Sequence, residues 1–224
     1  MKITEVKEAM LENGFSDELF EEFKKALKRV PKGNRSGHLY TFAHEIAGRK
    51  NGFEGALKMI NYVLEIPENH WVHNMRAYHA LADIYESREM YAEAHDAYAS
   101  ALSAVPEEQR QDYTASISVR MMKVYLHIVN FSYTPHLREL YEAAQGVDGL
   151  EAGFRGVIYY TAIAEMIVSR HDGDKEAYSR AKSRALDALY GENASPVDII
   201  LARHRYKNEA HATDASICFL KKAK

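Results

Sequence analysis

Apolar residues recur along most of the chain at intervals of three or four, the spacing of one face of a helix. In residues 16–30, the apolar positions are Leu19, Phe20, Phe23, Leu27 and Val30. Between them, acidic residues come early and basic residues late, an order that complements the helix dipole. No stretch of useful length alternates apolar and polar residues as a strand does. The pattern predicts an all-α protein.

The predicted helices come in pairs joined by short turns, and we expect twelve helices in six antiparallel pairs. Residues typical of turns occur at Gly14, at Asn51-Gly52 and at Asp172-Gly173-Asp174. The composition of residues 31–37 and 67–74 predicts loops. The last two helices are expected at about 196–206 and 209–222. One pair cannot bury its apolar face alone, so the pairs must pack on one another, and we expect a single domain over residues 1–224.

The most ordered pattern lies in residues 75–108. Its first helix carries Tyr78, Leu81, Ala82 and Tyr85 on one face, and its second carries Ala94, Tyr98 and Ala101 before Pro106. This order resembles the tetratricopeptide repeat, a helix–turn–helix unit with the pattern W-x2-L-G-x2-Y, then A-x3-F, then P. Tyr78, Ala82 and Tyr98 replace the Trp, Gly and Phe of that pattern with residues of the same size class. A weaker repeat spans residues 37–70, with Ala56 in the place of Ala94.

The resemblance implies an α-solenoid whose first helices line a concave groove that holds a peptide or a segment of another protein. Polar residues opposite the apolar faces are the candidates for this groove: His38, Thr41, Glu45, Arg49, Arg76, His79, Asp83, Glu86, Arg120, Lys123, His127, Thr161 and Glu165. The spacing loosens after Pro106, which leaves a compact helical bundle as the alternative fold. Trp71 is either a lid over the central repeat or an exposed anchor for a partner.

Composition narrows the classes of partner. The net charge is −3, from 29 basic and 32 acidic residues, which argues against a general binder of nucleic acids or acidic membranes. No apolar run reaches the length of a membrane span, and the N-terminus lacks the apolar segment of a signal peptide. The single cysteine, Cys218, excludes an internal disulfide and suits a reducing compartment. We therefore expect a cytoplasmic monomer without a cofactor.

Candidate chemistry is sparse. His70 and His73 are three residues apart, and His79 is close in sequence. Two histidines at this spacing can share a metal ion only on a regular turn and with a third ligand. The sequence has no HExxH motif, so we expect no metal site. No catalytic triad order, glycine-rich phosphate loop or CxxC motif is present either. Arg120 and His127 faintly resemble the RNA-cleaving motif of the HEPN ribonucleases, in which the His is an acid or base and the Arg steadies the phosphate. A helical ribonuclease is therefore kept as a remote alternative.

The sequence accordingly predicts a non-enzymatic module that binds proteins or peptides, as an adaptor, a chaperone-like holder or a regulator. The groove would be of mixed sign, because Glu45, Asp83 and Glu86 lie among its arginines. For that reason, the specificity of those family members that clamp a C-terminal carboxylate is not carried over. The alternative within the same class is an immunity protein or antitoxin that inhibits its partner, a role that a small, mildly acidic domain would suit.

Overall fold

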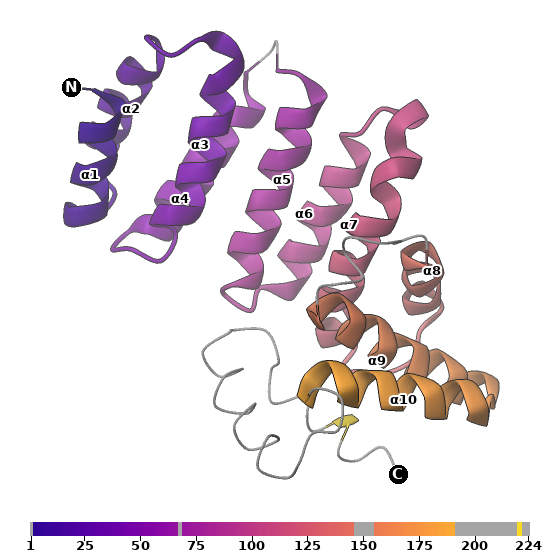
Figure 1. Ribbon diagram of the computed structural model, residues 1–224. Helices are drawn as coiled ribbons and strands as arrows, with labels where there is room; N and C mark the ends of the chain where they lie inside the picture. The colour runs from indigo at the N-terminus through magenta and orange to yellow at the C-terminus, as the bar shows by residue number, and fades with distance from the viewer. Residues whose placement is uncertain (1, 67–68, 146–154, 191–218, 221–224) are drawn as a thin grey trace. The chain divides into compact units, whose positions relative to one another are not determined.

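The computed structural model describes residues 2–66, 69–145, 155–190 and 219–220. This part of the chain forms ten α-helices and no strand, which confirms the all-α prediction (Figure 1). The helices are α1 (Ile3–Asn13), α2 (Asp17–Leu27), α3 (Lys32–Ile46), α4 (Gly52–Leu64), α5 (Trp71–Glu86), α6 (Tyr91–Ser103), α7 (Glu107–Ile128), α8 (Pro135–Ala144), α9 (Arg155–Asp172) and α10 (Lys175–Tyr190). A helix with the length and apolar character to span a bilayer is not found among them.

The chain divides into two compact units, residues 1–110 and residues 111–224. In the first unit, each odd-numbered helix contacts the helix that follows it, so that α1 pairs with α2, α3 with α4, and α5 with α6. In addition, α3 contacts both α1 and α5, and α4 contacts α5. The first helices of the three pairs therefore lie next to one another in the order α1, α3, α5 (Figure 1).

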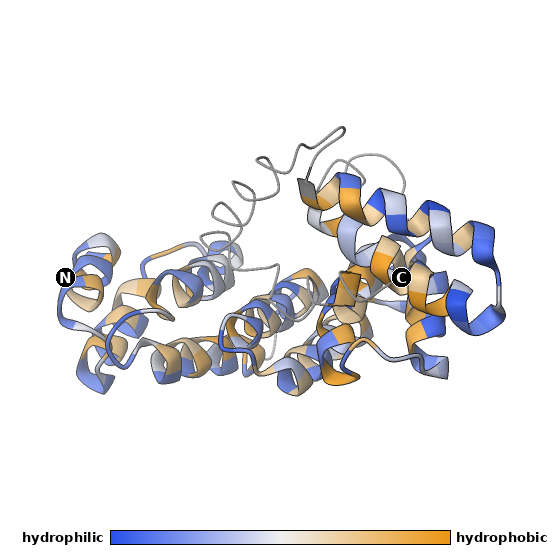
Figure 2. Cartoon of the chain, turned by 90° about the horizontal axis from the view of Figure 1, so that it is seen from below, coloured by the Kyte–Doolittle hydropathy of each residue, from blue (hydrophilic) through white to orange (hydrophobic). Residues whose placement is uncertain are grey.

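Buried apolar residues of its helices form the core of the first unit. Phe23 of α2 and Phe42 of α3 are both fully buried, and their rings stack with centroids 5.6 Å apart. The small residues of the central pair, Ala94 and Ala101, are also completely buried, as is Tyr98 between them. Figure 2 shows that the helices carry hydrophilic and hydrophobic positions together, as their amphipathic spacing predicts.

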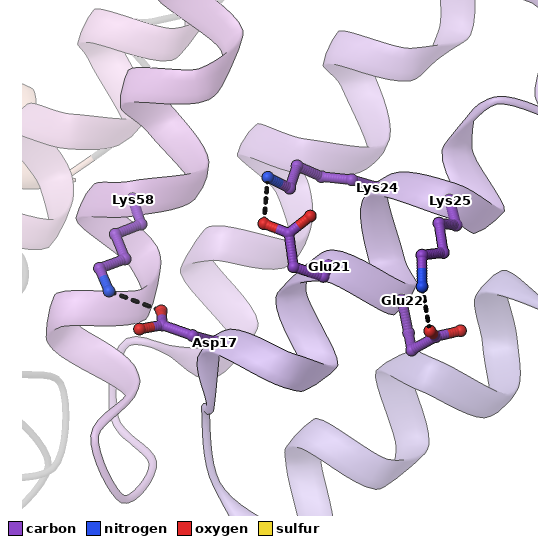
Figure 3. Close-up of polar contacts among 6 residues, drawn as sticks. All are labelled: Asp17, Glu21, Glu22, Lys24, Lys25 and Lys58. Atoms are coloured by element: carbon purple, nitrogen blue, oxygen red, sulfur yellow. Dashed lines mark hydrogen bonds and ion pairs between the residues drawn. The ribbon is translucent and has the colours of Figure 1, made fainter.

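The start of α2 shows how local sequence sets a helix. The hydroxyl of Ser16 accepts a hydrogen bond from the backbone N–H of Leu19, which satisfies one donor of the first turn. Asp17 forms an ion pair with Lys58 of α4 at 2.6 Å, and two further pairs along α2 join Lys24 to Glu21 and Lys25 to Glu22 (Figure 3). These pairs are exposed or, at Lys24, half-buried, and they contribute little stability, so α2 is held mainly by its buried apolar face.

Two of the predicted loops are partly helical. Helix α3 begins at Lys32, inside the stretch 31–37 whose glycines and polar residues predicted a loop. Pro31 places extended backbone directly before the helix, and the later turns of α3 bury Leu39 and Phe42, which outweighs the low helix propensity of the first turns. Likewise α5 begins at Trp71, so this side chain lies in the first turn of a helix and not in a loop.

In the second unit, α9 contacts both α8 and α10. In the sequence, Ala177, Ala181, Ala185 and Ala188 recur at intervals of four and three, which predicts a stripe of small residues on one helix face. This stripe lies on α10 and is buried at Ala181, Ala185 and Ala188. Gly173, with φ at 75°, makes the predicted turn between α9 and α10. Arg138 of α8 pairs with Asp172 at the end of α9. The small buried side chains of α10 suit close packing between this helix and α9.

The apolar spacing of Ile117, Met121, Val124, Tyr125 and Ile128 predicts the inner face of α7, and this prediction is wrong at its last position. Ile128 is 44% exposed, whereas Ile117 and Val124 are buried as predicted. After Ile128, the backbone turns through Asn130 and Phe131, both with positive φ, and the ring of Phe131 is buried instead. The predicted helices at 196–206 and 209–222 lie outside the described residues apart from residues 219–220, and so does Cys218.

Candidate functional site

A cluster of polar side chains from three helices surrounds the carboxylate of Asp83 on α5. Its Oδ1 accepts a hydrogen bond from the hydroxyl of Tyr98 on α6, at 2.5 Å. Its Oδ2 lies 3.4 Å from Nδ1 of His79 and 3.9 Å from Nε2 of His44 on α3. The Asp83 side chain is 33% exposed, so the cluster reaches the surface. One acidic group thus lies among side chains of three helices, of which Tyr98 and His44 are distant from it in sequence.

The sequence explains how α5 and α6 build this cluster. His79 and Asp83 are four residues apart and share one face of α5. The Tyr98 ring is fully buried and meets the His79 ring edge-on, with centroids 5.3 Å apart. A buried phenol needs a partner for its hydroxyl, and this one also lies 3.3 Å from Oε2 of Glu86. A tyrosine at the phenylalanine position of the repeat pattern therefore joins the core to the polar surface.

A second contact joins α3 and α5. Arg76 of α5 donates a hydrogen bond to the hydroxyl of Tyr40 on α3 at 3.4 Å. The Tyr40 ring lies 6.3 Å from the ring of His73, one turn before Arg76. Aromatic and cationic groups therefore lie together near the start of α5, whereas the acidic cluster lies nearer its end.

Of the eight groove candidates of the first unit, His79, Asp83 and Glu86 lie together around the Tyr98 side chain. All eight lie on three neighbouring segments of the chain. They lie on α3, on the turn that follows it, and on α5, which contacts α3. The exposed members are Thr41, Glu45, Arg49 and Arg76, and the half-buried members are His38, His79, Asp83 and Glu86. These eight residues, together with Tyr40 and His44, form a surface that we name the "α3/α5 face".

The other five candidates lie in the second unit. On α7, Arg120 is exposed, and the Lys123 ammonium lies 5.7 Å from the centre of the Tyr160 ring. On α9, the hydroxyl of Thr161 donates to the carbonyl of Val157, and Glu165 accepts from Arg184 of α10 at 2.7 Å. The Thr161 and Glu165 side chains therefore make contacts within their own unit.

Arg120 and His127 lie on the same helix, α7, about 10 Å apart along its axis, because seven residues make two turns. The His127 ring is half-buried and packs edge-on against Phe131 and Tyr160, at centroid distances of 5.3 Å and 6.2 Å. Aromatic rings thus surround the histidine of the remote ribonuclease alternative.

His44 is a member of the site that sequence reasoning missed. The apolar spacing through Tyr40, Ala43 and Ala47 placed it on the inner side of α3. Its side chain is 42% exposed and faces Asp83. His44 directly follows the buried Ala43 and lies at the edge of the buried face of α3. A polar residue at the edge of a buried helix face is a sequence signal for a surface site next to the core.

Trp71 and the histidines complete the predicted candidates. The Trp71 side chain is half-buried, and its ring lies 5.5 Å from that of His70. The His70 Nδ1 accepts the backbone N–H of Val72 and caps the start of α5. Within the described ranges, no group of three or more His, Cys, Asp or Glu residues has the arrangement of a metal site.

Two histidines of the first unit, His38 and His73, have lowered pKa values. Burial lowers the pKa of His38 and of His73 below 6.5, and Lys7 acts in the same direction on His38, as do Arg76 and His70 on His73. The folded state therefore favours the neutral rings, and the unfolded chain takes up protons first as pH falls. We expect stability to be fully present above about pH 6.5 and to fall as pH drops toward the lowered pKa values.

Urea unfolding measured at several pH values between about 7.5 and 5 would check this expectation. The double variant His38→Gln with His73→Gln should lose less stability across this range than the unaltered chain. An equal loss in both proteins would show that other groups carry the pH dependence.

Comparisons with protein-family models, with curated proteins and with solved structures found no match for this chain.

Proposed function

We propose that this chain is a non-enzymatic module that binds a segment of a protein or peptide on the α3/α5 face of its first unit. The main support is the Asp83 cluster, in which a surface carboxylate is held by a fully buried tyrosine. Side chains fixed in this way lose little conformational freedom on binding, which favours affinity.

The packing of the first unit supports a tetratricopeptide-like solenoid as its architecture. Its three helix pairs lie in sequence order, and the first helices of neighbouring pairs contact one another. Small residues at the repeat positions, among them Ala56, Ala94 and Ala101, are completely buried. In such an arrangement, the first helices form one continuous surface, which suits an extended or helical segment of a partner.

The charge of the face indicates the kind of segment. The α3/α5 face carries Arg49 and Arg76 as well as Glu45, Asp83 and Glu86, so both signs of charge are present. Tyr40 adds an aromatic surface beside Arg76. A segment that carries both acidic and basic residues with an apolar or aromatic anchor would complement this face. A partner segment whose charges are all of one sign would be repelled by the residues of the same sign at one end of the face.

The test is a paired substitution that preserves the fold. In the variant Arg76→Gln with Asp83→Asn, both charges are removed, while asparagine can still accept the hydrogen bond from Tyr98. Tagged chains would be used to capture partners from a lysate of the host, and affinities for a captured partner would then be measured. We expect the variant to bind about tenfold more weakly or worse, since charged anchors in a binding face are worth more than about 1 kcal/mol each.

A matched control removes the same charges elsewhere. Arg170→Gln with Asp187→Asn changes two exposed residues of the second unit and should leave the affinity unchanged. A partner that binds the test variant as tightly as the unaltered chain would place the interface on another surface. Loss of the partner's own activity in the complex would identify an inhibitor and not an adaptor.

A further inference from the structure

A hollow of about 560 Å³ lies at one end of the helices of the first unit. It is formed where α2 and α4 end and where α3 and α5 begin. Its lining residues are Lys24, Leu27, Lys28, Lys32, Gly33, Arg35, Ser36, Leu39, Tyr62, Glu65, Ile66, Asn69, His70 and His73. The volume is in the range of pockets that bind small molecules. None of the eight groove candidates lines it, so it is a separate feature from them.

The lining is strongly cationic although the chain as a whole is slightly acidic. Three lysines and Arg35 line the hollow, whereas Glu65 is the only carboxylate among the lining residues. Lys24 is paired with Glu21. For Lys28 and Lys32, the described residues provide neither an ion pair nor a hydrogen bond to the ammonium group. Gathered like charges repel one another, and an anion bound among them would relieve that repulsion.

The start of α3 adds to this attraction. Pro31 stands at its cap without a side-chain acceptor, and no acidic residue lies in the first turn. The first N–H groups of a helix have no partner within the helix, and the dipole makes this end positive. Gly33 of this turn lines the hollow. The lysines and the helix end therefore favour an anion at the same place.

The hollow is also fixed in shape. The Arg35 guanidinium donates from Nε to the carbonyl of Val30 at 2.9 Å and from Nη2 to that of Lys28 at 2.8 Å. These bonds tie the end of α2 to the start of α3 and leave further N–H donors on the guanidinium. In addition, His73 Nδ1 is buried and has no hydrogen-bond partner among the residues described. The remaining lining includes apolar side chains, Leu27, Leu39 and Ile66, and the ring of Tyr62.

We propose that this hollow binds a small molecule that carries a phosphate or diphosphate group next to an apolar part. Lys28, Lys32 and the first turn of α3 take the anionic oxygens, and the apolar lining takes the rest of the molecule. A phosphate concentrates up to about two negative charges on one group, which matches several cations around one helix start. The proposal does not rest on the partner-binding role of the α3/α5 face.

Calorimetric titration with inorganic phosphate, pyrophosphate and phenyl phosphate, at constant ionic strength, tests it. We expect saturable binding in the millimolar range or tighter, with phenyl phosphate above inorganic phosphate because of the apolar lining. The variant Lys28→Gln with Lys32→Gln should bind at least about tenfold more weakly, since hydrogen bonds to charged groups are the strong ones. The control Lys25→Gln with Lys50→Gln, two exposed lysines outside the hollow, should bind as the unaltered chain does.

A second measurement uses the unaltered chain alone, so it does not depend on any variant being folded. Amide resonances of the unaltered chain should shift on adding pyrophosphate, and the largest shifts should fall at Lys32 and Gly33. Equal affinity of the test variant, the control and the unaltered chain would overturn the proposal, as would shifts confined to other residues. Tighter binding of a hexaglutamate peptide than of pyrophosphate would overturn it too, because the hollow would then belong to an acidic peptide. Each of these results leaves the test of the α3/α5 face unaffected.

Discussion

Replacing Gly52 with alanine should destabilise the first unit by about 3 kcal/mol or more, because the added methyl group has no room. A Cβ at Gly52 would lie 1.7 Å from the carbonyl oxygen of Ile46, which belongs to the backbone of α3 and cannot simply rotate away. The turn between α3 and α4 would have to open, and the contact between these helices would weaken. Thermal unfolding followed by circular dichroism should show a midpoint lower by roughly 10–20 °C for the first unit.

Gly48 provides the matched control, since it lies in the same turn and a Cβ there would meet no atom within 4 Å. Gly48→Ala should leave the midpoint nearly unchanged or raise it slightly, because alanine restricts the unfolded chain more than glycine does. If the two variants unfolded at the same temperature, the close approach of Gly52 to Ile46 would not contribute to stability.

This turn illustrates how far the sequence alone can be taken. The pair Asn51-Gly52 predicted a turn between two helices, and Asn51 has a left-handed backbone with φ at 55°. The close approach of Gly52 to α3 was not predictable, since it depends on how the two helices pack. Helix periodicity likewise predicted α2 and α6 well. It failed at the starts of α3 and α5, where residues of loop-like composition are drawn into helices by the packing of later turns.

The candidate site was likewise predictable from the sequence only in part. The spacing of His79 and Asp83 predicted a shared helix face, because four residues make about one turn. His44 and Tyr40 join the site only through the contact of α3 with α5, which no local pattern specifies. The cationic hollow was missed for a similar reason. In the sequence, Lys28 is an ordinary cation at the end of a helix, and Lys32 falls in a stretch of loop-like composition.

Truncating Tyr98 should have the largest effect on the candidate site, because this residue belongs both to the core and to the Asp83 cluster. The side chain is fully buried, so Tyr98→Ala should cost about 3–5 kcal/mol through lost contacts and the cavity left behind. Tyr98→Phe keeps the ring and removes the hydroxyl, which donates to Asp83 and also lies 3.3 Å from Oε2 of Glu86, for an expected cost of about 1–2 kcal/mol. Hydrogen exchange of the amides of α5 and α6 would measure the stability lost in each of the two variants, for the first unit separately from the second.

The phenylalanine variant also separates the two roles of Tyr98. With the ring retained, α5 and α6 should keep their packing, while the Asp83 carboxylate loses the donor that fixes it against α6. Binding of a captured partner should therefore weaken in Tyr98→Phe more than in a core variant of similar stability. Ile60→Val is suited as that variant, since Ile60 is buried on α4, a helix that contributes no residue to the cluster. Equal weakening in both variants would mean that Tyr98 acts only through stability. Unchanged binding in Tyr98→Phe would mean that the orientation of Asp83 does not matter to the partner.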